Sequence, residues 1–91
     1  MMKFEELKFV KRGCIKNKQA LVFFKNGYGA SIIIGSYSYG GNEGLYEIAV
    51  LKGNKKQWSI CYDTPITDDV IGHLKPEEVE ETLKQIKELR R

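Results

Sequence analysis

The sequence predicts an α+β fold, in which an antiparallel meander sheet of about five strands carries one C-terminal amphipathic helix packed on it. Three observations predict this fold. Five β-favouring runs follow one another along the chain, short turn signals separate them, and a single segment with helical periodicity comes last. Strands followed by a helix are typical of α+β proteins, and consecutive strands joined by short turns usually pair as neighbours.

The chain has the size and composition of one globular domain. Its 91 residues favour a single domain over 1–91, with 42% apolar and 30% charged residues. No apolar run approaches the ~18 residues that a membrane span requires, and residues 1–10 contain no signal-peptide core. We therefore expect no membrane partner and a cytoplasmic location.

The first two strands are expected at 7–12 and 19–25, the second because it contains the dense run Leu-Val-Phe-Phe. Asn26-Gly27 follows directly. This pair predicts a tight two-residue hairpin turn, because it tolerates the positive φ that both turn positions require. Residues 28–34 are then the partner strand of the hairpin.

The run Ile32-Ile33-Ile34 shows no alternation, so we expect this strand to be covered on both faces. The helix supplies one cover, and either a subunit partner or the twisted rim of the same sheet supplies the other. A chain this short buries only about 60–65% of its unfolded surface. Together these observations predict a homo-oligomer.

Residues 35–44, four of which are glycine, break the strand pattern and predict a loop. The fourth strand is expected at 45–52 and the fifth at 57–62. Gly53-Asn54 forms the turn between them.

Residues 63–74 are expected to be a connector that contains start and stop signals of a short helical turn. Thr67 can cap a short helical turn that begins with Asp68 and Asp69, and Gly72 can end it.

The last segment carries the clearest helical signal. Pro76 suits the first helical position, where no amide donor is needed. Glutamates follow it at the positive end of the helix dipole, and lysines and arginines lie toward the negative end. The apolar stripe at helical spacing consists of Val79, Leu83, Ile86 and Leu89 or Arg90.

Cysteine and histidine chemistry is limited. Cys14, Cys61 and His73 cannot close a four-ligand zinc site, so we expect neither a metal nor a cofactor. Cys61 and His73 are also the one pair that could form a thiolate with its base, but nothing in their spacing brings them together. A buried thiol and a surface histidine are the favoured interpretation, and we expect a protein that is not an enzyme.

Short polar side chains gather beside two aromatic residues. Asp63, Thr64 and Thr67 lie near Trp58 and Tyr62 in the sequence. Turn formation and helix capping account for these polar groups. The alternative is that they donate and accept hydrogen bonds to the hydroxyl groups of a ligand.

Charge is uneven along the chain. Residues 1–30 carry seven basic and two acidic side chains, whereas 31–91 carry eight basic and ten acidic ones. A basic half favours anionic partners such as phosphates or nucleic acid, although lysines that guard a sheet edge give the same pattern. For an anionic ligand, Arg12 and Lys25 are the expected phosphate contacts.

The glycine-rich loop carries Tyr37 and Tyr39, two residues apart among serine, glycine and asparagine. This composition is typical of adaptable binding loops, so the tyrosines can cover a base or insert into a partner protein. A hairpin tip without a binding role is the alternative. The loop is not a phosphate-binding P-loop, because Gly41 stands where that motif requires lysine.

Two stretches resemble short proteins that are encoded by phages and prophages of Gram-positive bacteria. They are 18–32, with KQALV running into FKNGYGASI, and 61–70, with CYDTPITDDV. The resemblance carries no catalytic motif and no assigned reaction, so it transfers no functional residue. It implies a context in the cytoplasm of a bacterial host, where small phage proteins inhibit defence enzymes or sequester signalling nucleotides.

We therefore expect a non-enzymatic phage accessory protein with a counter-defence role. It would bind and sequester a small anionic ligand, a nucleotide-type defence signal. The expected ligand-binding residues are Arg12, Lys25, Tyr37, Tyr39, Asp63, Thr64 and Thr67. A protein–protein inhibitor of a host defence enzyme and a small single-strand nucleic-acid-binding protein stay open as alternatives.

Overall fold

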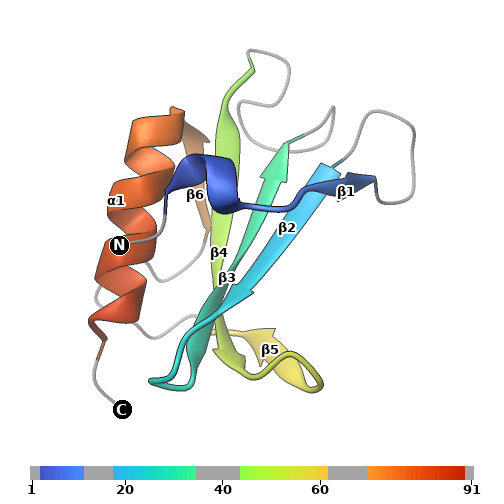
Figure 1. Ribbon diagram of the computed structural model, residues 1–91, viewed down its shortest axis with the longest axis vertical. Helices are drawn as coiled ribbons and strands as arrows, with labels where there is room; N and C mark the ends of the chain where they lie inside the picture. Colours follow the sequence, from blue (N-terminus) through green and yellow to red (C-terminus); the bar gives the residue numbers. More distant parts are fainter. Residues whose placement is uncertain (1–2, 12–17, 35–43, 62–69, 90–91) are drawn as a thin grey trace.

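The structure, a computed structural model, describes residues 3–11, 18–34, 44–61 and 70–89. In these residues an antiparallel sheet carries one α-helix on one face (Figure 1), so the predicted α+β fold with a C-terminal helix is confirmed. The elements are η1 (Phe4–Glu6), β1 (Val10–Lys11), β2 (Lys18–Phe23), β3 (Tyr28–Ile34), β4 (Tyr46–Gly53), β5 (Trp58–Ile60), β6 (Val70–Leu74) and α1 (Pro76–Lys87).

β2 and β3 form the predicted hairpin, but the predicted two-residue turn is wrong. The Phe24 N–H donates to the Tyr28 carbonyl at 2.8 Å, and the Gly27 N–H donates to the Phe24 carbonyl at 3.3 Å. The loop therefore has three residues, and Gly27 has a φ of 87° while Asn26 does not have a positive φ. A turn closed by one left-handed glycine is the usual form of a three-residue hairpin loop.

β4 pairs with three other strands. One of its edges pairs with β3 along most of its length, and β5 and β6 share the other edge. The Cys61 N–H donates to the Val50 carbonyl at 2.7 Å, and Val70 pairs with Ala49, the next residue along β4. β5 and β6 thus follow one another end to end along the same edge.

β6 corrects the predicted connector. Residues 70–74 form a strand that includes Gly72, so this glycine does not end a helical turn. Thr67, Asp68 and Asp69, the other residues of that predicted turn, lie outside the described residues. Pairing with the free edge of β4 decides the conformation here, because a neighbouring strand satisfies the backbone hydrogen bonds of residues 70–74.

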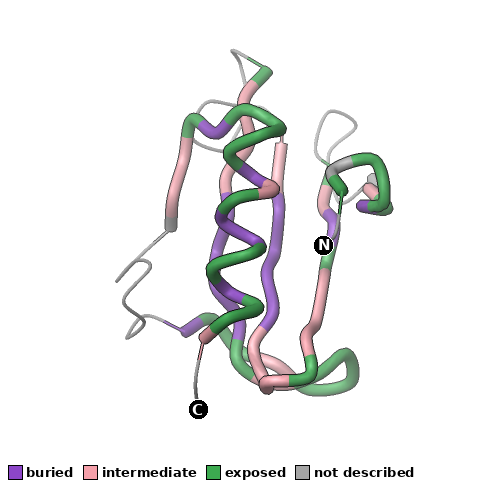
Figure 2. Tube along the Cα trace, turned by 60° about the vertical axis from the view of Figure 1, so that its left-hand side comes forward, coloured by how far each residue is buried: buried purple, intermediate pink, exposed green. Residues whose placement is uncertain are grey.

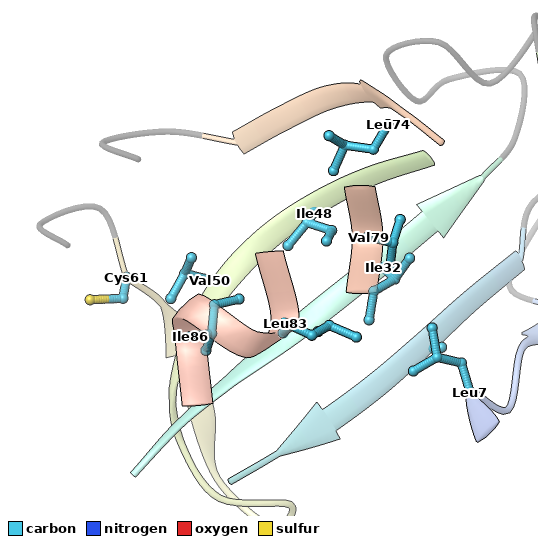
Figure 3. Packing of buried hydrophobic residues seen from close by; sticks show 11 residues of the cluster. Leu7, Ile32, Ile48, Val50, Cys61, Leu74, Val79, Leu83 and Ile86 are labelled. Atoms are coloured by element: carbon cyan, nitrogen blue, oxygen red, sulfur yellow. The ribbon is translucent and has the colours of Figure 1, made fainter. Parts of the chain in front are cut away.

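The core lies between α1 and one face of the sheet. Val79, Leu83 and Ile86 form the predicted apolar stripe of the helix, and each is at most 2% exposed. Figure 3 shows them against Ile32, Ile48 and Val50 of the central strands, with Leu7, Cys61 and Leu74 at the margins. Figure 2 shows the same division along the helix, whose buried positions alternate with exposed ones.

The helix begins where the sequence predicts. Pro76 is its first residue, and the Glu78 carboxylate accepts a hydrogen bond from the backbone N–H of Lys75 at 2.9 Å. This contact satisfies a backbone donor that the helix itself leaves unpaired.

The other face of the sheet carries a second, smaller apolar layer. The rings of Phe23 and Trp58 approach to 6.5 Å between centroids, across the strands that carry Gly29 and Gly53. Leu51, which lies between them in the register, is fully buried although α1 covers the opposite face.

The expected cover on both faces of the run Ile32-Ile33-Ile34 is found in part, because Ile32 is buried whereas Ile33 and Ile34 are half-buried. In β3, residues 29–32 are all buried, with Ala30 and Ile32 facing α1 and Gly29 and Ser31 facing the other way. Ser31 accepts a hydrogen bond from the Gln19 side chain at 2.7 Å. At residues 29–32, side chains of the same chain bury both faces of the strand. The expected homo-oligomer stays a prediction, which light scattering can test.

Candidate anion-binding site

One of the seven predicted ligand-binding residues, Lys25, lies within the described residues, where it is exposed. The other six lie outside them. These are Arg12, Tyr37, Tyr39, Asp63, Thr64 and Thr67.

Two described residues, Lys11 and Ile34, directly precede Arg12 and the segment that carries the tyrosines. Both pair with Lys18 at the start of β2. Lys25 follows the other end of β2, about 20 Å away for a strand of this length. Lys25 and these two residues therefore lie at opposite ends of the sheet.

Lys25 belongs to a group of exposed lysines at one end of the molecule. The β2–β3 turn, the β4–β5 turn and the C-terminus of α1 all lie at this end (Figure 1). We call it the basic end, and its lysines are Lys25, Lys52, Lys55, Lys56 and Lys87.

Hydrogen bonds join the three segments of the basic end. The Asn26 side-chain amide donates to the carbonyls of Ile86, Lys87 and Leu89 at 2.9, 3.1 and 2.9 Å. The Gly53 N–H donates to the Gly27 carbonyl at 2.9 Å. These bonds fix both hairpin turns and the helix terminus relative to one another, so the backbone that carries the lysines is preassembled.

Local sequence explains the shape of the β4–β5 turn. The Asn54 side-chain oxygen accepts hydrogen bonds from the backbone N–H groups of Lys56 and Gln57, at 2.9 and 3.1 Å. Asn54 and Gln57 also exchange two backbone hydrogen bonds. An asparagine that bonds to the backbone two residues ahead is a typical turn former, and here it leaves Lys55 and Lys56 exposed at the tip.

The basic end has a strong excess of positive charge. The described residues of the three segments include one acidic residue, Glu88, which is exposed. The acids of the first turn of α1 lie at the other terminus of this 12-residue helix, roughly 18 Å away. Such an excess of lysines over acidic side chains creates a positive potential that attracts anions.

Sequence reasoning missed four of these five lysines. It assigned the basic surface to residues 1–30, yet Lys18 and Lys25 of that half lie at opposite ends of β2. One signal was available, because alternate turns of a meander lie at the same end of the sheet. The lysines around Gly53-Asn54 could have been placed beside Lys25 on that basis.

Two aromatic residues border the basic end. Trp58 pairs with Gly53 immediately after the β4–β5 turn, and its ring packs against Phe23. Both residues are half-buried, and each lies close in sequence to a turn that carries exposed lysines.

The residues considered for catalysis do not come together. Cys61 is buried in the core opposite Val50, whereas His73 is exposed beside Leu74, which pairs with Tyr46. Val50 and Tyr46 are four residues apart along β4, about 13 Å, which is beyond the reach of a thiol–imidazole hydrogen bond. No group of three metal-ligating side chains occurs in the part of the chain that the structure describes.

Among the described residues, no helix is both long and apolar enough to cross a membrane. Comparisons of the chain with protein-family models, with curated proteins and with solved structures find no match. Function must therefore be inferred from the residues themselves.

Proposed function

We propose that the protein is a non-enzymatic binding protein that sequesters a phosphate-bearing ligand of nucleotide type at the basic end. One observation carries this proposal: five exposed lysines from three separate segments lie at one end, on turns that hydrogen bonds join. Lysine binds phosphate as a point charge, and several such charges on a fixed backbone favour a ligand with more than one phosphate.

The aromatic residues beside the lysines suit the same class of ligand. Trp58 and Phe23 offer ring surface next to the positive charge, and every nucleotide base has a flat face that stacks on such rings. Arg12, Tyr37, Tyr39, Asp63, Thr64 and Thr67 stay predictions for further ligand contacts. The resemblance to phage-encoded proteins favours a host defence signal as the ligand and a counter-defence role for its capture.

Tryptophan fluorescence provides a direct test, because Trp58 is the single tryptophan of the chain. The protein is titrated with a cyclic dinucleotide, and the same titration is repeated with Lys52→Ala/Lys55→Ala/Lys56→Ala. The matched control is Lys3→Ala/Lys8→Ala/Lys18→Ala, which removes three exposed lysines elsewhere. We expect binding to weaken at least about tenfold for the first variant only, since the loss of a single hydrogen bond to a charged group, worth about 1.5–3 kcal/mol, already corresponds to that factor.

Equal losses in the two variants would show that general charge, rather than the basic end, governs binding. Absence of binding by the unmodified protein to cyclic dinucleotides and to other nucleotides would refute the proposal.

Single-stranded nucleic acid is the second candidate, and the aromatic pair beside the lysines favours it. Oligothymidylates of increasing length separate the two candidates. Affinity that rises with length beyond that of a dinucleotide supports nucleic-acid binding, whereas sequestration of a small signal predicts no gain from length.

A further inference from the structure

We propose that Asn26-Gly27 is a protected deamidation site, at which loss of the Asn26 side-chain amide releases the C-terminus of α1 from the β2–β3 turn. The observation behind it is the unusual role of this amide. It donates to three backbone carbonyls, those of Ile86, Lys87 and Leu89, about sixty residues away in the chain.

The chemistry needs only water. The backbone nitrogen of Gly27, after losing its proton, attacks Cγ of Asn26. The new N–Cγ bond closes a five-membered imide, the Cγ–Nδ2 bond breaks, and the side-chain nitrogen leaves as ammonia after taking up a proton. Water then opens the imide at one of its two carbonyls, which leaves aspartate or isoaspartate at position 26. Glycine at 27 presents no side chain that would hinder the attack.

The folded protein holds both reacting groups. The Gly27 N–H donates to the Phe24 carbonyl at 3.3 Å, so its nitrogen is engaged in the turn. The Asn26 side-chain oxygen accepts from the Tyr28 N–H at 3.1 Å while its nitrogen binds the helix terminus. Ring closure therefore requires the turn to open and to leave α1, which breaks the hydrogen bonds of Asn26 to the helix terminus and the bond of Gly27 to Phe24.

The product cannot restore the contact. A carboxylate has only acceptors, and the groups it would face are carbonyl oxygens, which are also acceptors. These carbonyls form the negative end of the helix dipole, which repels an anion. Each deamidation event therefore replaces three hydrogen bonds with repulsion.

The reaction can be followed in the full chain without any ligand. The protein is incubated at mildly alkaline pH in buffer and in concentrated urea, then digested, and the acid form at Asn26 is measured by mass spectrometry. Asn54, in the exposed β4–β5 turn, is the internal control. We expect the conversion of Asn26 relative to Asn54 to be at least about tenfold lower in buffer than in urea, because reaction requires local opening. An equal ratio in both conditions would overturn the proposed protection.

Two variants test the consequence. Asn26→Ala removes the amide group that makes the three hydrogen bonds, and Asn26→Asp removes that group and adds a negative charge. We expect the urea midpoint to fall in the order unmodified protein, Asn26→Ala, Asn26→Asp. If Asn26→Asp is as stable as Asn26→Ala or more so, repulsion by the product is refuted. If Asn26→Asp does not fold, the rate comparison on the unmodified chain still decides whether the site is protected.

Discussion

Gly44 and Gly53 both have a left-handed backbone, with φ of 76° and 131°, but their surroundings differ. A Cβ at Gly44 would meet nothing within 4 Å. A Cβ at Gly53 would collide with the Gln57 carbonyl oxygen and lie 2.8 Å from Cα of Trp58. Gly53 is therefore constrained by a neighbouring strand as well as by its own backbone.

These two glycines form a matched pair of substitutions. Gly44→Ala should cost about 1 kcal/mol of unfolding free energy, the cost of a left-handed alanine. Gly53→Ala should cost about 3 kcal/mol or more, because overpacking adds to that backbone cost. Urea denaturation of both variants measures the difference, and equal losses would contradict the close approach of β5 at Gly53.

At the same scale, Asn26 shows what local sequence can and cannot predict. The Asn-Gly pair predicted a hairpin turn at the right position, because backbone conformation there depends on adjacent residues. The hydrogen-bond partners of the Asn26 side-chain amide lie at the end of α1, which follows about sixty residues later in the chain. No local pattern encodes such a contact.

Among the elements, β6 has an irregular register. Tyr46 pairs with Leu74 and Ile48 with Ile71, so β6 has one residue more than β4 over this interval. His73 lies in this bulge with a φ of 59°, a region in which histidine and asparagine occur more readily than β-branched residues.

Substitution of His73 tests this bulge. His73→Val should lower the unfolding free energy by about 1–2 kcal/mol relative to His73→Asn, because valine in a left-handed conformation is strongly disfavoured. Thermal unfolding followed by circular dichroism compares the two variants. If the valine variant is the more stable one, the backbone at position 73 cannot be left-handed.

Regular elements were predicted well from the sequence, and the strand with the bulge was missed. Strand 28–34 and the helix start at Pro76 are found where expected, because regular pairing and helical periodicity both leave a clear pattern. Residues 70–74 were not expected to be a strand. The extra residue breaks their alternation, and Gly72 gave a misleading stop signal.

For the whole molecule, the acids of the first turn of α1 lie at the helix terminus that is opposite the basic end. Sequence charge counts could not show this, because three distant segments supply the lysines. Binding at the basic end should weaken as salt concentration rises, since counterions screen exposed charges.

Lys25 and Lys18 test this distribution, because both are exposed and they flank opposite ends of β2. In a cyclic dinucleotide titration, Lys25→Ala should weaken binding about tenfold and reduce its salt dependence. Lys18→Ala should leave both nearly unchanged. The reverse result would place the anion site at the other end of the sheet.

The shared edge of β4 has a consequence for how this protein can diversify. Cys61 and Val70 occupy neighbouring positions along that edge, although eight residues separate them in the sequence. Joining Cys61 directly to Val70 would keep the alternation of the ladder and yield a five-stranded meander. Residues 62–69 can therefore be exchanged, by evolution or by a protein engineer, while the pairing of β5 and β6 with β4 is kept. Asp63, Thr64 and Thr67, which stay predictions for ligand contacts, all belong to this segment.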